Sequence, residues 1–135
     1  MSSIHADEQA LATMAQKDLD GPVVMLNLLR YRERAESGHG VDGLTGEEAY
    51  RFYGREFAKL NPRFGGEPIW MGLADQVVVG REDWDVVILV RYPSRAAFVS
   101  MMSDPDYQAI APIRAAALAD SRLIETDQLL PKLDR

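Results

Sequence analysis

The chain has 135 residues, of which 47% are hydrophobic and 27% are charged, a balance typical of one globular domain spanning residues 1–135. Its formal net charge is −6 and its fifteen Lys and Arg residues are scattered, which argues against nucleic acid or an anionic membrane surface as the main partner. The absence of cysteine excludes disulfides, a thiolate nucleophile and a Cys-ligated metal. We find neither a signal peptide nor the ~18 apolar residues of a membrane span, and therefore predict a soluble, cytoplasmic protein.

The first third of the chain predicts a helix, a buried strand and a loop. Residues 7–18 have a helical pattern with Leu11 and Met14 on one side, and Gly21-Pro22 is a plausible stop. Residues 23–29 (VVMLNLL) are apolar on both faces except at Asn27, which predicts a buried strand. Residues 30–46 are polar and rich in glycine, and they predict a long, mobile loop of the kind that closes over binding sites.

The middle of the chain begins with a helix and continues with strands. Thr45 and Glu48 match a capping box, and the apolar residues that follow recur with the 3.6-residue period of a helix up to Asn61-Pro62. Gly65-Gly66 forms a turn into a strand at residues 67–73, and a further strand-like run occupies 76–79. A turn at residues 80–83 would then complete a hairpin with the next strand.

That next strand is the most apolar of the chain. Trp84, Val86, Ile88, Val90 and Tyr92 would lie on one of its faces, with Val87 and Leu89 on the other, so both faces are expected to be covered. Pro93 ends the strand and Ser94 can cap a helix, which restarts at Asp104-Pro105. Residues 122–130 are expected to form the last strand.

This order of elements predicts an α+β protein with the ferredoxin-like βαββαβ arrangement and an extra N-terminal helix. The first and third strands, which are the most apolar, would occupy the centre of the sheet. Right-handed crossovers place both main helices on one face and leave an apolar face open. We expect a second copy of the chain to cover that face, giving a homodimer.

The segments GGEPIWMG, WDVVILVRYPSRAAF and DPDYQAIAPIR, together with this order of elements, resemble a domain-of-unknown-function family of the dimeric α+β barrel superfamily. The resemblance covers roughly residues 23–130. It implies that two sheets pair into a barrel and that each protomer has a pocket between its sheet and its helices. Relatives in the superfamily include cofactor-free monooxygenases, muconolactone isomerases and haem-binding proteins, so the resemblance indicates the fold more than the chemistry.

Arg114 is the main candidate for a catalytic residue, because it lies seven residues after Tyr107 on an apolar helical face. It could bind a carboxylate or an enolate. Alternatively, it could lie at the edge of that face and pair with a nearby acid. Asn27 could point into a pocket or fix a backbone irregularity, and both interpretations stay open.

Aromatic side chains with polar tips are candidates for ligand binding, although such residues also build cores. We select Tyr53, Trp70, Trp84 and Tyr107. His39, between two glycines in the long loop, could act as a general base, or could be a solvated loop residue.

No cofactor or metal is predicted, because the two histidines are distant and no nucleotide-binding glycine motif occurs. The leading hypothesis is therefore a protein that binds a small aromatic or carbonyl compound in a pocket closed by the 31–46 loop. If it is an enzyme, it would be a cofactor-free oxygenase or isomerase. The alternative is a non-catalytic metabolite-binding or stress-type protein, and the sequence leaves the choice open.

Overall fold

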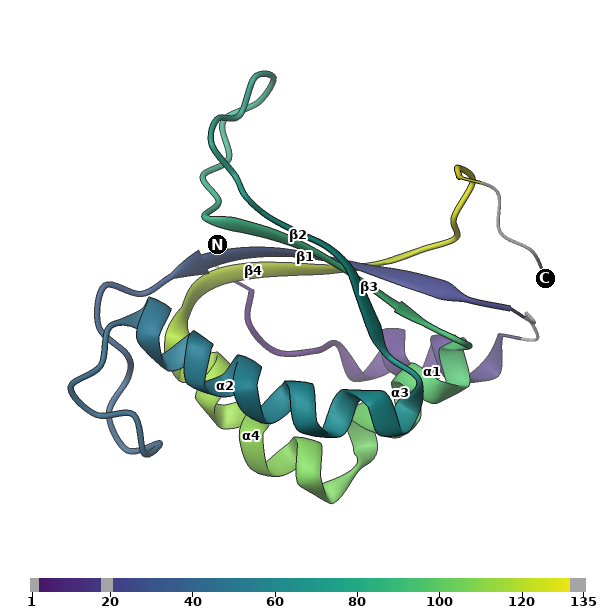
Figure 1. The fold of residues 1–135 in the computed structure, drawn as a ribbon, viewed down its shortest axis with the longest axis horizontal. Coiled ribbons are helices and arrows are strands. Elements are labelled where there is room, and N and C mark those ends of the chain that lie inside the picture. The colour runs from purple at the N-terminus through teal and green to yellow at the C-terminus, as the bar shows by residue number, and fades with distance from the viewer. Residues whose placement is uncertain (1–2, 18–20, 132–135) are drawn as a thin grey trace.

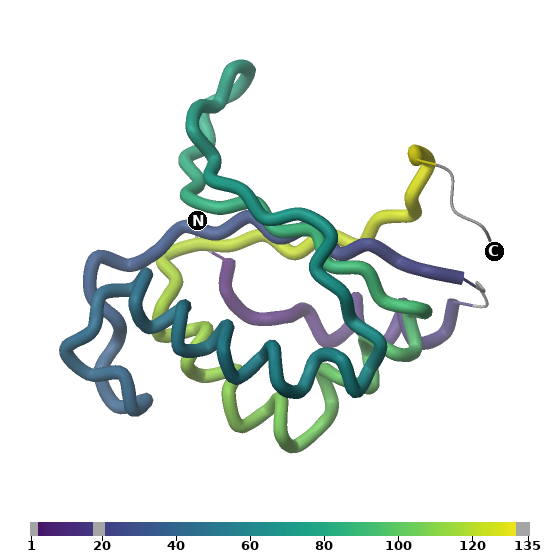
Figure 2. Tube along the Cα trace, viewed as in Figure 1, coloured from purple at the N-terminus to yellow at the C-terminus, as the bar shows by residue number. Residues whose placement is uncertain are grey.

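The computed structural model describes residues 3–17 and 21–131, which form one four-stranded antiparallel sheet with helices on one side (Figure 1, Figure 2). The strand order is β2-β3-β1-β4, so the predicted ferredoxin-like α+β fold with β1 and β3 at the centre is confirmed. The elements are α1 (Glu8–Gln16), β1 (Val23–Tyr31), α2 (Gly46–Leu60), the 3₁₀ helix η1 (Asn61–Phe64), β2 (Glu67–Leu73), β3 (Val86–Tyr92), α3 (Arg95–Ser103), α4 (Pro105–Ala117) and β4 (Leu118–Thr126).

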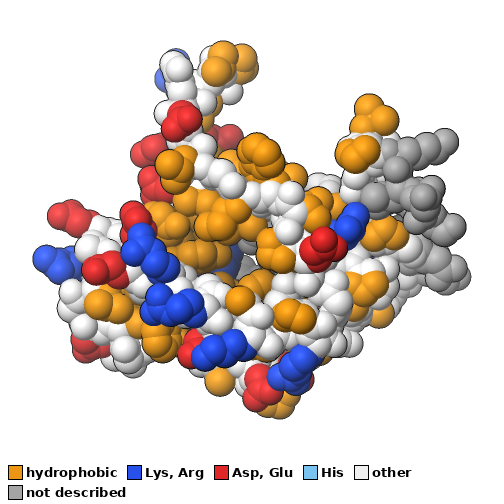
Figure 3. Space-filling view, in the orientation of Figure 1, with side chains coloured by type: hydrophobic (Ala, Val, Ile, Leu, Met, Phe, Trp, Pro, Cys, Tyr) orange, Lys and Arg blue, Asp and Glu red, His pale blue; other side chains and the backbone are white. Residues whose placement is uncertain are grey.

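The central strands have the two apolar faces that their sequences predict. In β3, Val86, Ile88, Val90 and Tyr92 are buried, whereas the alternate residues are only half-buried. The buried side chains belong to the core between the sheet and the helices, and the half-buried side chains lie on the opposite face of the sheet. In the space-filling view, hydrophobic side chains gather around the sheet layer, above a hollow between sheet and helices (Figure 3).

The predicted strand at residues 76–79 is wrong. Strand β2 pairs directly with β3, with Leu73 opposite Val86, and the chain between them forms a loop that projects away from the helices (Figure 1). Val78 and Val79 in this loop are 86% and 91% exposed. A run of valines favours a strand only where a neighbouring strand can complete the hydrogen bonds, and within the described residues no strand pairs with 76–79.

The last strand also differs from the prediction, because it begins at Leu118 instead of Arg122 and ends at Thr126. The alanine-rich residues before it favour a helix by local propensity. Pairing with β1, where Tyr31 lies opposite Leu118, instead converts the chain to a strand directly after Ala117.

The loop between β1 and α2 is anchored, in contrast to the mobile loop that we expected. The backbone N–H groups of Arg32 and Glu36 donate to the carbonyls of Ala117 and Ala116, each at 2.9 Å. The side chain of Val41 is 2% exposed and belongs to the core. The loop therefore packs against the end of α4, and its glycines form turns within an ordered segment.

Helix α2 begins as the sequence predicts, at a capping box. The Thr45 hydroxyl accepts from the Glu48 N–H at 3.1 Å, and the Glu48 carboxylate accepts from the Thr45 N–H at 2.9 Å. The first helical residue, Gly46, is buried, and a Cβ atom there would lie 2.6 Å from the Ala117 carbonyl oxygen and nearer still to that of Arg32. This close approach locks the start of α2 to the loop and to the end of α4.

Two glycines of α2 provide a matched test of this contact. We expect Gly46→Ala to lower the free energy of unfolding by about 3 kcal/mol, because two backbone carbonyls must move. Gly54→Ala should raise it by up to ~1 kcal/mol, since a Cβ there meets nothing within 4 Å and alanine favours the helix. Urea unfolding measures both. Equal effects of the two substitutions would contradict the packing described here.

Candidate functional site

A cavity of about 610 Å³ lies between the helix-facing side of the sheet and the helices. All four strands contribute to its floor, α2 and α4 form one wall, and α3 closes one end. A further wall is formed by α1 together with the residues that precede it. The lining is mostly apolar, so its few polar groups determine what it can bind.

Asn27 lies in the floor of this cavity. It belongs to the set of β1 residues that face the helices, and its side-chain N–H donates to the Met25 carbonyl at 3.4 Å. The irregularity of this strand falls between Arg30 and Tyr31, away from Asn27. The structure therefore agrees with the interpretation that Asn27 points into a pocket.

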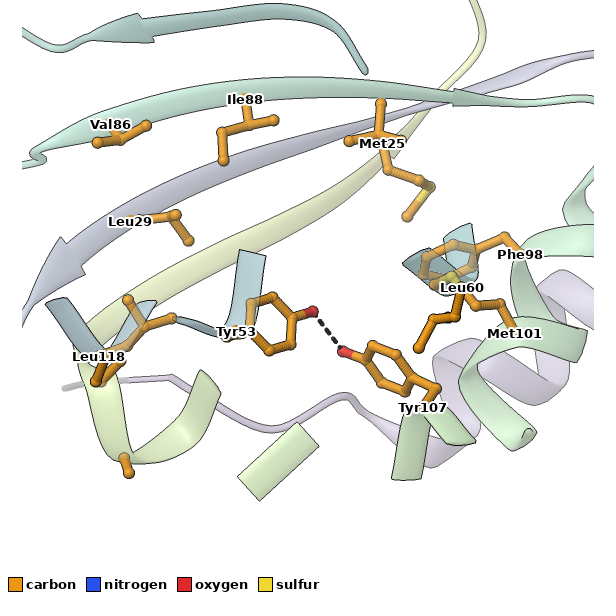
Figure 4. Packing of buried hydrophobic residues seen from close by; sticks show 14 of the residues in the cluster. Met25, Leu29, Tyr53, Leu60, Val86, Ile88, Phe98, Met101, Tyr107 and Leu118 are labelled. Carbon is orange, nitrogen blue, oxygen red and sulfur yellow. Dashed lines mark hydrogen bonds between the residues drawn. The ribbon is translucent and has the colours of Figure 1, made fainter. Parts of the chain in front are cut away.

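Tyr53 and Tyr107 come together in the cavity wall. Their hydroxyl groups are 3.1 Å apart, and Figure 4 shows them pointing toward one another beneath the apolar side chains of the sheet. Tyr53 also stacks on Phe57, with ring centroids 5.7 Å apart. Burial raises the pKa of Tyr53 well above its usual value, so this phenol keeps its proton and can donate it in a hydrogen bond.

Arg114 reaches the same cavity from α4 and is half-buried. Its Nη1 donates to the Ile4 carbonyl at 3.1 Å, and its guanidinium also interacts with the Tyr50 hydroxyl. Within residues 3–17 and 21–131, Arg114 forms no ion pair with a carboxylate. The alternative account of Arg114, a pairing with a nearby acid, is therefore not what these residues show.

The N-terminal strap, which we define as residues 3–17, is the part of the site that sequence reasoning missed. Ser3 is held by Asp120 and Ser121 of β4, through hydrogen bonds of 2.7 and 2.6 Å. At the other end, Lys17 lies 2.8 Å from Glu125, also on β4. Between these anchors the strap lines the cavity. The apolar positions Leu11 and Met14 indicated a packed helix, but nothing in the sequence indicated where it packs.

The two tryptophans lie outside this cavity. Trp70 is 60% exposed and lies opposite Leu89, on the face of the sheet away from the helices. Trp84 is buried under the guanidinium of Arg122, whose carbon is 5.1 Å from the ring centroid. The structure therefore does not bring either side chain together with Arg114.

His39 is also separate from the cavity, and the 31–46 loop does not line it. The His39 ring lies 3.3 Å from Glu36 in a smaller hollow beside Arg32. Among the described residues there is no group of three or more His, Cys, Asp or Glu side chains that could hold a metal ion. No helix in the described part of the chain is long and apolar enough to cross a membrane.

Comparison with known families gives a match over residues 41–126 to the domain of unknown function DUF1330. The chain belongs to this family. The protein of unknown function RPA0582 from Rhodopseudomonas palustris is 40% identical, with a TM-score of 0.89 over 97% of this chain and 100% of that one. These findings confirm the predicted domain-of-unknown-function family.

More distant structures share the fold of this DUF1330 protein. A dimeric ferredoxin-like protein of unknown function from Jannaschia sp. CCS1 is 12% identical, with a TM-score of 0.56 over 80% of this chain and all of that one. A Dabb family protein from Mesorhizobium loti with a ferredoxin-like fold is also 12% identical, with a TM-score of 0.52 over 82% and 99% of the two chains. No curated protein matched the chain.

The electrostatics of this DUF1330 cavity can be tested at Tyr50. Burial raises the pKa of Tyr50 to about 12, although the charge of Arg114 opposes this rise. Folding therefore holds the Tyr50 proton more tightly than the unfolded chain does. The stability that this provides is complete below pH 10 and is lost as the pH rises from 10 toward 12.

Tyr50→Phe removes this ionisation, so the free energy of unfolding of the variant should fall less steeply between pH 10 and 12 than that of the parent. Urea unfolding at intervals across this range measures both slopes. Identical slopes would show that Tyr50 ionises as freely in the folded protein as in the unfolded chain.

Proposed function

We propose that this protein binds a small organic anion, an aromatic or carbonyl compound with a carboxylate or enolate group, in the cavity between sheet and helices. One observation supports the proposal above the others. The guanidinium of Arg114 lines a mostly apolar cavity, and it has no carboxylate partner among the described residues.

The energetics of Arg114 favour an anionic ligand. A charge that is partly removed from water is costly unless it is paired, and a carbonyl with a phenol compensates it only in part. The guanidinium has five N–H donors in a planar fork that matches the two oxygens of a carboxylate. A bound carboxylate would complete the set of partners that the fold leaves incomplete.

The phenols can orient the ligand. Because Tyr50 and Tyr53 have raised pKa values, both remain protonated at neutral pH and can donate hydrogen bonds to an oxygen. Phe57 and the apolar side chains of the sheet supply a surface for a ring or a chain. Together these groups could stabilise negative charge that develops on a substrate oxygen, as a cofactor-free oxygenase or isomerase requires.

The acidic groups at the cavity favour the second candidate, a non-catalytic binding protein. Burial tends to raise the pKa of Glu125, but hydrogen bonds from Lys17 and Arg95 outweigh it and hold the pKa below its ordinary value. Asp7 accepts two N–H groups at the start of α1. Glu125 is therefore a weak base, and Asp7 already caps α1, so catalysis would require either His5 at the exposed rim or a substrate that ionises by itself. Turnover assays with phenols, quinones and enol-lactones separate the two candidates.

Arg114→Gln should weaken the binding of an anionic ligand such as benzoate by roughly 10- to 100-fold, because charge-assisted hydrogen bonds contribute about 1.5–3 kcal/mol. Isothermal titration calorimetry measures the affinity. Arg55→Gln is the control, since Arg55 is exposed on α2 and lies over Phe52 outside the cavity. Equal affinities in the Arg114 variant and the parent would refute the anion site, and circular dichroism would show whether the variant is folded.

We also propose that the open face of the sheet pairs with a second copy of the chain. The face carries half-buried and exposed apolar side chains from all four strands: Leu26, Leu28, Val87, Leu89, Trp70 and Ile124. An apolar face of this kind is unusual in a monomer. If this face packs against the same face of a second copy, the result is a two-fold dimer. The ferredoxin-like neighbour from Jannaschia is described as dimeric.

Leu89→Asp places a charge at the centre of this face and should shift the protein from dimer to monomer, as measured by light scattering after size-exclusion chromatography. Phe52→Asp, on the outer side of α2, is the control and should leave the dimer intact. A parent protein that is monomeric at micromolar concentration would overturn the proposed dimer.

A further inference from the structure

The methionines of this chain are concentrated at one place in the fold. The sequence has six, and five of them line the cavity: Met14, Met25, Met71, Met101 and Met102. They come from α1, β1, β2 and α3, so no single element accounts for the grouping. Met14, Met25 and Met101 are at most 5% exposed, whereas Met71 is 65% exposed on the edge strand.

Arg114 lies toward the start of α2, whereas Met25 and Met101 lie toward its end. Arg114 and Tyr50 lie toward the start of α2, and the hydroxyl pair of Tyr53 and Tyr107 lies further along this helix. Beyond that pair, Figure 4 shows Met25, Leu60, Phe98 and Met101 grouped together. Because α2 advances ~1.5 Å per residue, the distance along it from Tyr50 to Ala58, both of which line the cavity, is about 12 Å. We call the part of the cavity around Met25 and Met101 the methionine end. Its polar groups are Asn61 and Glu125, and Glu125 is paired with Lys17 and Arg95.

The chemistry of methionine indicates which kind of ligand group the methionine end of the cavity accepts. Its side chain is unbranched, has three rotatable bonds and a polarizable sulfur, and adapts to partners of different shape. A wall of branched aliphatic side chains would fix one shape more rigidly. The adaptable side chains of Met25 and Met101 therefore favour a flexible hydrocarbon chain at this end of the cavity.

We infer that the ligand is an amphiphilic carboxylate with a flexible aliphatic tail, whose head group binds Arg114 and Tyr50 and whose tail extends past the tyrosine pair to Met25 and Met101. This inference rests on the proposed anion-binding function and specifies its ligand class. A cavity of about 610 Å³ falls within the range that encloses ligands of this size.

Calorimetry with three sets of probes tests the inference on the intact protein. The first is the series of straight-chain carboxylates from hexanoate to laurate, the second is the matched primary alcohols, and the third is benzoate with 2-naphthoate. We expect carboxylate affinity to rise up to about fourfold per added methylene, which is ~0.8 kcal/mol of burial, until the tail fills the methionine end. The alcohols should bind at least tenfold more weakly than the acids.

Each outcome of this experiment has a defined meaning. If the aromatic acids bind and the aliphatic acids do not, the inference on the tail is overturned and the anion site stands. If no carboxylate binds, both the inference and the proposed function fail. If alcohols bind as tightly as acids of equal length, binding of a tail at the methionine end is supported. The role of Arg114 is then refuted, and with it the amphiphilic carboxylate.

A substitution at the methionine end distinguishes the tail from the head group. Met101→Phe should shorten the preferred chain, so that laurate affinity falls at least tenfold while hexanoate affinity is kept. Met25→Phe serves as a second variant if the first does not fold, and Leu129→Phe is the control because Leu129 is 85% exposed. Unchanged laurate affinity in a folded variant would show that the tail does not reach this end.

Discussion

The alternation of side chains along β1 and β3 is the constraint on which the rest of the structure depends. Successive residues of a strand point to opposite faces, so two central strands that carry apolar residues on both faces must be covered twice. One set, which includes Met25 and Ile88, forms the floor of the cavity beneath the helices. The other set, which includes Leu28 and Leu89, forms the open face. The cavity and the proposed dimer interface are therefore two sides of the same strands.

The sequence predicted the parts of the fold that local interactions determine. The capping box of α2 involves residues three positions apart, and the cap of α3 joins Ser94 to the N–H of Ala97. Such contacts form wherever the chain has the right residues at the right spacing. The central strands could be predicted equally well, because a strand with apolar residues on both faces is stable mainly in the middle of a covered sheet. The position of Arg114 in the cavity followed from its helical spacing to Tyr107.

Contacts between distant residues determine what the sequence did not predict. Ser3 and Asp120 are 117 positions apart, and no local pattern relates the N-terminal strap to the edge of β4. The start of β4 depends on pairing with β1, which overrides the helix propensity of the preceding alanines. The grouping of methionines is hidden for the same reason, since their positions in the sequence run from 14 to 102. His39 shows the same limit, because its residue type and its glycine neighbours do not reveal that it lies outside the cavity, in a smaller hollow.

Arg114 connects closure of the cavity with its occupancy. The same guanidinium donates to the Ile4 carbonyl of the strap and interacts with Tyr50 inside the cavity. A carbonyl is a neutral acceptor, so it satisfies a hydrogen bond of the arginine but leaves its charge uncompensated. A bound carboxylate would neutralise that charge without needing the N–H that holds the strap. Binding and closure would then be compatible, and the strap, anchored to β4 at both ends, would cover the ligand that Arg114 retains.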